Sequence, residues 1–113
     1  MIYTEAELMF REIKEAVAGD DALLALYRGF LLSAIKYARY RTDWRINDLE
    51  TRKSMDAPRR AAHDNLIADC DILSRSLAAR GRPNDWRGRL GGDRKVIGDF
   101  ACYVHSILGA EAR

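Results

Sequence analysis

The chain has 113 residues, the length of a single domain, and is long enough to bury a hydrophobic core. Apolar residues make up 48% and charged residues 32% of it, which is typical of a globular protein and excludes a disordered chain. Two cysteines, Cys70 and Cys102, are too few for a disulfide framework. The first residues are acidic where a secretion signal is basic, and no apolar run is long enough to span a membrane. We therefore expect a cytoplasmic protein that does not contact a membrane.

The net charge of +2 conceals one acidic segment and two basic segments. Residues 1–21 carry two basic and six acidic side chains, a net charge of −4. Residues 36–60 carry eight basic and four acidic side chains (+4), and residues 75–95 carry seven and two (+5). Basic segments in a nearly neutral chain can bind an anion locally, but they attract nucleic acid only modestly over long distances.

Only two prolines occur and no segment alternates apolar and polar residues, which predicts an all-α fold. A first helix begins near Thr4, because Thr4 and Glu7 have the spacing of a capping box, and Tyr3 is placed to pack on Leu8. Gly19 is a suitable end for this helix. Its predicted apolar face consists of Leu8, Ile13, Ala16 and Val17.

The second helix is capped by Asp20 or Asp21 and runs at least to Arg41. We expect it to continue, straight or kinked, to about Lys53, the alternative being a new helix that starts at Thr42 or Asp43. Apolar residues recur along it with helical spacing at Leu23, Leu26, Tyr27, Phe30, Leu31, Ala34, Tyr37 and Ala38. The same face then continues as Arg41, Trp44, Arg45, Asp48, Leu49, Arg52 and Met55.

A third helix is expected to begin at Asp56, because Pro58 then falls in its first turn, and to run to about Arg80, before Gly81. Its apolar stripe consists of Ala62, Leu66, Cys70, Leu73 and Leu77. Residues 81–92 form an irregular basic connection. Asp93 caps a last helix with a stripe of Val96, Phe100, Tyr103, Val104 and Ile107, and Ile97 and Leu108 at its edge. The expected architecture is one domain over residues 1–113, a four-helix bundle, with a fifth short helix near Trp86 as the alternative.

Three short segments carry a resemblance. They are residues 59–67, which contain Arg59, His63 and Ile67, residues 71–75, and residues 90–101 with the run Gly98-Asp99-Phe100-Ala101. Together they resemble a family of small uncharacterised helical proteins of bacteria and phages. Asp71 stands where the pattern has an asparagine, so no hydrogen-bonding role carries over to this position. The resemblance implies a small helical protein and no particular activity.

The strongest candidate for a binding site is the charged series that begins at Arg41 and continues the apolar face of the second helix. Arginines on a core face are costly unless they are paired, so they form either an internal ion-pair network or a place where an anion binds. The planar guanidinium suits phosphate and carboxylate, and the next helix provides a facing wall. The candidate ligand-binding residues are Arg41, Trp44, Arg45, Arg52, Arg59, Arg60 and His63.

His63 and Asp64 are adjacent, as in some metal phosphohydrolases, but that class needs further ligands and a much longer chain. We expect His63 to bond a neighbouring backbone or carboxylate group, and Arg60–Asp64 and Asp71–Arg75 to pair along the helix. A zinc site is disfavoured because His63 and Cys70 lie about 10.5 Å apart along the axis. No metal, no cofactor and no catalytic residue are predicted.

Trp86 lies among the arginines of the connection, where it could stack on a nucleic-acid base or fold back onto the bundle as a lid. The lid is favoured, because tryptophan is usually largely buried. Sequence-specific DNA binding is disfavoured, since no helix places several basic residues on one exposed face.

We therefore expect a non-catalytic protein that acts through association with itself or with another protein. Ile72 lies opposite the stripe of its helix, and Leu24, Leu32 and Ile35 extend the apolar surface of the second helix beyond one face. The alternative is a small module that binds an anionic ligand, a nucleotide or a nucleic acid, in an arginine-rich polar pocket.

Overall fold

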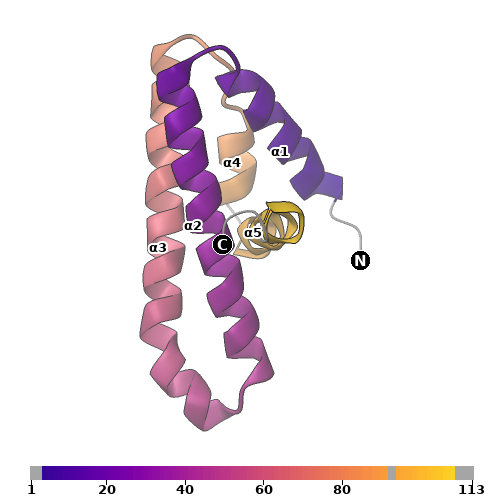
Figure 1. The fold of residues 1–113 in the computed structure, drawn as a ribbon, viewed down its shortest axis with the longest axis vertical. Helices are drawn as coiled ribbons and strands as arrows, with labels where there is room; N and C mark the ends of the chain where they lie inside the picture. The colour runs from indigo at the N-terminus through magenta and orange to yellow at the C-terminus, as the bar shows by residue number, and fades with distance from the viewer. Residues whose placement is uncertain (1–3, 92–93, 109–113) are drawn as a thin grey trace.

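The computed structural model describes residues 4–91 and 94–108, and within these ranges every regular element is a helix (Figure 1). The predicted all-α fold is confirmed, and the described part has five helices, as the alternative with a short helix near Trp86 expects. In chain order they are α1 (Thr4–Val17), α2 (Asp21–Ile46), α3 (Leu49–Ala79), α4 (Trp86–Gly91) and α5 (Arg94–Leu108). None of these described helices is both long and apolar enough to cross a membrane.

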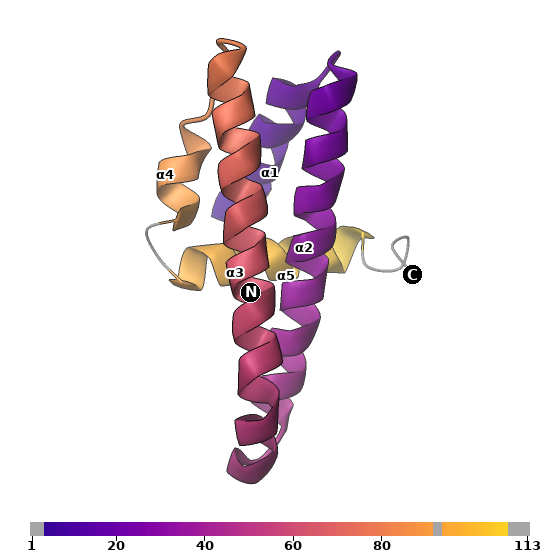
Figure 2. The same ribbon diagram turned by 90° about the vertical axis from the view of Figure 1, so that its left-hand side faces the viewer.

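The two longest helices, α2 and α3, lie antiparallel and form a hairpin (Figure 1). The other three helices pack against the half of the hairpin in which α2 begins and α3 ends, with α5 lying across the hairpin (Figure 2). The half that contains the turn between α2 and α3 extends beyond them in both views. Ala38 and Ala62 are the last fully buried residues before this half, and none of residues 39–61, all of which the structure describes, is buried. We refer to residues 39–61 as the arm.

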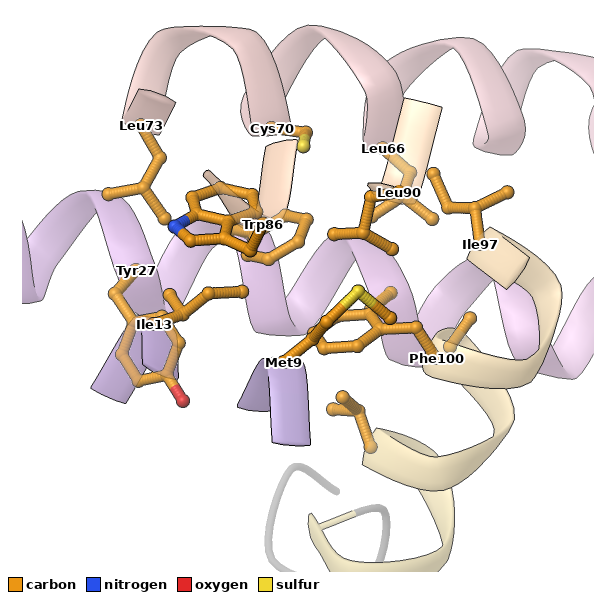
Figure 3. Packing of buried hydrophobic residues seen from close by; sticks show 14 of the residues in the cluster. Met9, Ile13, Tyr27, Leu66, Cys70, Leu73, Trp86, Leu90, Ile97 and Phe100 are labelled. Atoms are coloured by element: carbon orange, nitrogen blue, oxygen red, sulfur yellow. The ribbon is translucent and has the colours of Figure 1, made fainter. Parts of the chain in front are cut away.

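The core lies between the hairpin and the three shorter helices (Figure 3). The ring of Phe30 stacks on the rings of Trp86 and Phe100, with centroid distances of 6.1 Å and 5.4 Å. These three rings come from α2, α4 and α5, so they join three elements that are distant in sequence. Offset aromatic pairs of this kind contribute beyond their buried area.

The apolar stripe predicted for α2 is buried or half-buried throughout, and so are the stripes predicted for α1 and α5 except at Leu8 and Ile107. Leu8 is 46% exposed, whereas Met9 is fully buried, because Met9 lies one turn before Ile13 on the same face. On α5 the centre of the buried face is Ile97, at 1% exposure, and the predicted Ile107 is 43% exposed.

The second helix does not continue to Lys53 and does not break at Thr42 or Asp43. It ends at Ile46, and Asp48 caps α3 by accepting a hydrogen bond from the Thr51 N–H at 2.8 Å. Periodicity alone missed this turn, because the stripe of α2 passes into the start of α3 with little change of phase. Asp48 therefore caps a helix rather than belonging to a continuous polar stripe.

The predicted start of the third helix at Asp56 is also wrong. Helix α3 begins at Leu49, so Pro58 lies inside it and leaves one backbone hydrogen bond unmade. The carboxylate of Asp56 pairs with arginines of its own helix instead of capping. The other boundaries agree with the predictions, because Asp20 caps α2, and Gly19 and Gly81 have φ of 78° and 67° after α1 and α3. The predicted contact of Tyr3 and the cap at Asp93 lie outside the described residues.

Candidate functional site

Trp44, near the end of α2, lies between two arginines of α3. The Cζ atoms of Arg52 and Arg59 are 4.5 Å and 4.7 Å from the centroid of its ring. Each cation–π contact contributes about 0.5–1 kcal/mol where it is solvent-accessible. Arg52 also donates to the backbone carbonyls of Trp44 and Arg45, at 2.8 Å each, which have no partner within the helix. Polar contacts thus hold the two helices of the arm together where no apolar core exists.

Asp56 pairs with two arginines of the same helix. Its Oδ1 accepts from Arg59 Nη2 at 2.8 Å, and its Oδ2 lies 2.7 Å from Arg60 Nε. The hydrogen bond from Arg59 lowers the pKa of Asp56 below its usual value, against the opposing effect of desolvation. Asp56 therefore stays ionised at neutral pH, and its carboxylate contacts both the Arg59 and the Arg60 guanidinium groups.

Between α2 and α3, at the base of the arm, the structure has a polar pocket of about 320 Å³. It is lined by Tyr37, Arg59, Arg60, His63 and Asp64. The ring of His63 packs edge-on against Tyr37 at 5.3 Å, and its Nδ1 lies 3.5 Å from Asp64 Oδ1. This agrees with the prediction that His63 bonds a neighbouring carboxylate. The Nε of Arg59 is buried and has no hydrogen-bond partner.

The predicted cluster does not form one wall. Arg59, Arg60 and His63 line the polar pocket, while Trp44 and Arg52 lie next to it in the arm. Arg41 reaches the opposite way, toward α5, where its Nη1 lies 3.9 Å from Cys102 Sγ. Arg45 is exposed. The reason is that α2 ends at Ile46 and the chain reverses there. Residues before and after this turn would share one face of a continuous helix, but they face different neighbours once they lie on two antiparallel helices.

Two predicted ion pairs along α3 are replaced by others. Arg60 pairs with Asp56 instead of Asp64, one turn in the opposite direction. Asp71 pairs with Arg87 of α4, at 2.6 Å, instead of Arg75. The second pair could not be found from helical spacing, because its partner lies on another element.

The basic connection is a lid. Trp86 is 1% exposed and Leu90 is fully buried. The arginines of the connection are also engaged: Arg82 donates to the carbonyls of Ala16 and Ala18 at the end of α1, at 2.9 Å and 2.8 Å. Arg89 pairs with Glu5 and Glu12 of α1. In this structure the indole of Trp86 is therefore not available to stack on a nucleic-acid base, and its burial agrees with the favoured lid interpretation.

The turn of the arm carries a feature that sequence reasoning missed. Ile46 is 76% exposed and Leu49 is 74% exposed, the highest values among the exposed large hydrophobic residues of the described chain. Next to them is a hollow of about 470 Å³ lined by Trp44, Leu49, Glu50, Arg52, Lys53 and Asp56. The adjacent Asn47 and Asp48, both turn-forming residues, are the signal that could have placed this pair at a helix reversal.

The described residues contain no group of three or more His, Cys, Asp or Glu side chains that could hold a metal ion. Cys70 and Cys102 are free thiols. The fold and site thus define an all-α bundle with a projecting helical arm and a polar pocket at its base. Comparison with protein-family models, curated proteins and solved structures gives no match, so function must be argued from this geometry alone.

Proposed function

We propose that this protein is a non-catalytic cytoplasmic module that associates with a second copy of itself through the turn of its arm. The observation that carries the proposal is the exposure of Ile46 and Leu49, three residues apart at the end of a projecting hairpin. Isolated exposed apolar residues are ordinary on a protein surface. Two of them on either side of the turn at a projecting tip, with a hollow lined by Trp44 and Leu49, are typical of a contact surface.

The chemistry of the tip favours a second copy over an unrelated partner. A two-fold contact brings the same patch of both copies together, so the patch must be complementary to itself. The tip has both an apolar projection, Ile46, and a hollow with Trp44 in its lining. Its rim carries Glu50 and Lys53, which are 86% and 74% exposed and pair weakly at 3.3 Å within one copy. Across a two-fold axis these opposite charges can pair between copies.

The expected affinity follows from the apolar side chains that the contact would bury. Burying one such side chain contributes about 1.5–3 kcal/mol, so four of them contribute roughly 6–12 kcal/mol. The lost freedom of the two molecules opposes this by at least about 4 kcal/mol. The difference is roughly 2–8 kcal/mol, and the upper part of this range, about 4–8 kcal/mol, corresponds to a dissociation constant between about 1 mM and 1 μM.

Sedimentation equilibrium tests the proposal over a concentration range of about 1 μM to 1 mM, the span of the expected dissociation constant. We expect the mass of the wild-type chain to rise from 12.8 kDa toward twice that value. Ile46→Ser and Leu49→Ser should each weaken association by about tenfold or more. Ile72→Ser is the matched control, because Ile72 is 46% exposed but lies outside the arm, and it should leave association unchanged.

Three outcomes would contradict self-association through the tip. The first is a monomer at every concentration, and the second is a wild-type dimer that Ile46→Ser leaves intact. The third is a loss of association in Ile72→Ser as large as that in Leu49→Ser. Because Ile46 and Leu49 are exposed, both variants should fold, and circular dichroism verifies this before the masses are compared.

A further inference from the structure

We propose that the polar pocket at the base of the arm binds a small phosphate monoester with a hydroxyl-bearing organic part. The proposal does not require self-association: the pocket and the tip hollow share no lining residue, although Trp44 and Asp56 of the hollow contact Arg59 of the pocket. It rests on the charges of the pocket, on the unused donors of its arginines, and on the way these side chains are held.

The pocket has hydrogen-bond donors in excess of its internal acceptors. Asp56 contacts one nitrogen of Arg59 and one of Arg60, whereas each guanidinium carries five N–H donors. The side chain of Arg60 is 72% exposed, so it can turn toward a ligand at the mouth of the pocket. Arg59 is mostly buried, and its Nε is an unpartnered buried donor. A phosphate oxygen supplies acceptors for the terminal N–H groups of these arginines that Asp56 does not use, and it matches the planar fork of the guanidinium.

Two of the pocket side chains, Arg59 and His63, are held in place before any ligand arrives. Arg59 is fixed on one side by the ring of Trp44 and on the other by Asp56. His63 is fixed by its edge-on contact with Tyr37, which is 5% exposed. A rigid site loses little side-chain freedom on binding, so more of the interaction appears as affinity. Mobile surface arginines without such contacts do not have this advantage.

Size and charge limit the class of ligand. A pocket of about 320 Å³ is at the lower end of the range for small-molecule sites, which suits one phosphate with a small organic group. The carboxylate of Asp64 is 81% exposed at the edge of the pocket. It repels a second phosphate but accepts hydrogen bonds from hydroxyl groups. Ribose 5-phosphate has this combination and serves as the probe.

The test is a titration of the full chain with ribose 5-phosphate, followed by NMR of the histidine rings at constant ionic strength. We expect saturable shifts of the His63 resonances, with His105 as an internal reference on α5. Arg60→Gln should weaken binding by about tenfold or more, as expected for the loss of a charged donor. Arg45→Gln, which removes an exposed arm arginine outside the pocket, should change the affinity by less than about twofold.

The site would be overturned if the His63 resonances did not move up to about 10 mM ligand, a concentration that detects very weak binding. It would also be overturned if Arg45→Gln weakened binding as much as Arg60→Gln, since that result indicates non-specific attraction to the arm. Equal affinity for ribose 5-phosphate and inorganic phosphate would overturn the role of Asp64 toward the organic part. Asp64→Asn should weaken binding of the sugar phosphate more than that of inorganic phosphate.

Discussion

Trp86 offers a direct test of how the basic connection is anchored. Its ring is 1% exposed and stacks on Phe30, which in turn stacks on Phe100 (Figure 3). Replacing a buried tryptophan by alanine costs about 3–5 kcal/mol, because contacts are lost and a cavity remains. This is a large part of the roughly 5–15 kcal/mol by which a domain is usually stable. At roughly 4 °C for each kcal/mol, Trp86→Ala should lower the Tm by about 12–20 °C.

Trp86→Phe tests the contribution of the aromatic ring to stability separately from that of the indole N–H. The indole Nε1 is buried without a hydrogen-bond partner, so phenylalanine keeps an aromatic ring and removes an unsatisfied donor. The loss of ring volume and the relief of that donor are each about 1–2 kcal/mol and oppose one another. We therefore expect the free energy of unfolding of Trp86→Phe to stay within about 1 kcal/mol of the wild-type value.

Urea denaturation followed by far-ultraviolet circular dichroism measures both variants, since it does not depend on tryptophan fluorescence. The reasoning would be refuted if Trp86→Ala unfolded at the same urea concentration as the wild type. Such a result, together with a loss of oligonucleotide binding, would restore the interpretation of Trp86 as a stacking platform for bases. Retained stability in Trp86→Phe with strong destabilisation in Trp86→Ala is the pattern expected of a lid.

Three further predictions concern contacts between elements. An added Cβ at Gly98 would lie 2.5 Å from Arg41 Cζ, so the flexible Arg41 side chain must move aside in Gly98→Ala. The helical advantage of alanine, about 1 kcal/mol, should therefore be larger when Arg41 is also alanine. A double-mutant cycle of urea denaturation measures this coupling, and zero coupling would contradict the contact. Arg82→Gln removes two hydrogen bonds to the end of α1 and should cost about 1–2 kcal/mol by the same method, whereas an unchanged unfolding curve would show that these bonds are unimportant. Burial raises the pKa of the Cys70 thiol to about 12, so a thiolate-specific reagent at pH 8 should modify half-buried Cys102 first, and equal rates would contradict the packing. Because the unfolded thiol ionises near pH 8.5 and the folded thiol does not, the free energy of unfolding should fall between about pH 8.5 and 12, by up to about 1.4 kcal/mol per pH unit.

The buried faces could be predicted from the sequence wherever helical periodicity is long and uninterrupted. Leu23, Phe30 and Ala34 of α2 and Leu66 of α3 are fully buried, as their spacing predicts. On α1 the predicted Ile13, Ala16 and Val17 are also buried. The prediction fails only at Leu8, which is exposed, because Met9 and not Leu8 lies one turn before Ile13 on the buried face.

The candidate site was predictable in its residues but not in its arrangement. Helical spacing predicted Arg41 and Arg52 on one face. Because the chain reverses at Asn47, Arg41 instead lies near Cys102 of α5, and Arg52 donates to the carbonyl of Trp44. A hydrophobic period does not show whether a helix continues or turns back, since both arrangements can preserve the stripe. Ion pairs such as Asp71 with Arg87 depend on tertiary packing and are therefore absent from any local pattern.

The distribution of charge is consistent with a proposed anion site at the base of the arm. The segments 1–21 and 75–95 have net charges of −4 and +5, and the fold brings them together through Arg89 with Glu5 and Glu12, and Arg80 with Asp20. Their opposite charges therefore largely neutralise each other within the bundle. The segment 36–60 keeps a net charge of +4, and most of it is the arm, of which the end with the turn extends beyond the other helices. We therefore expect an anionic ligand to be attracted to the arm and its base rather than to the connection, although the connection is the more basic segment in sequence.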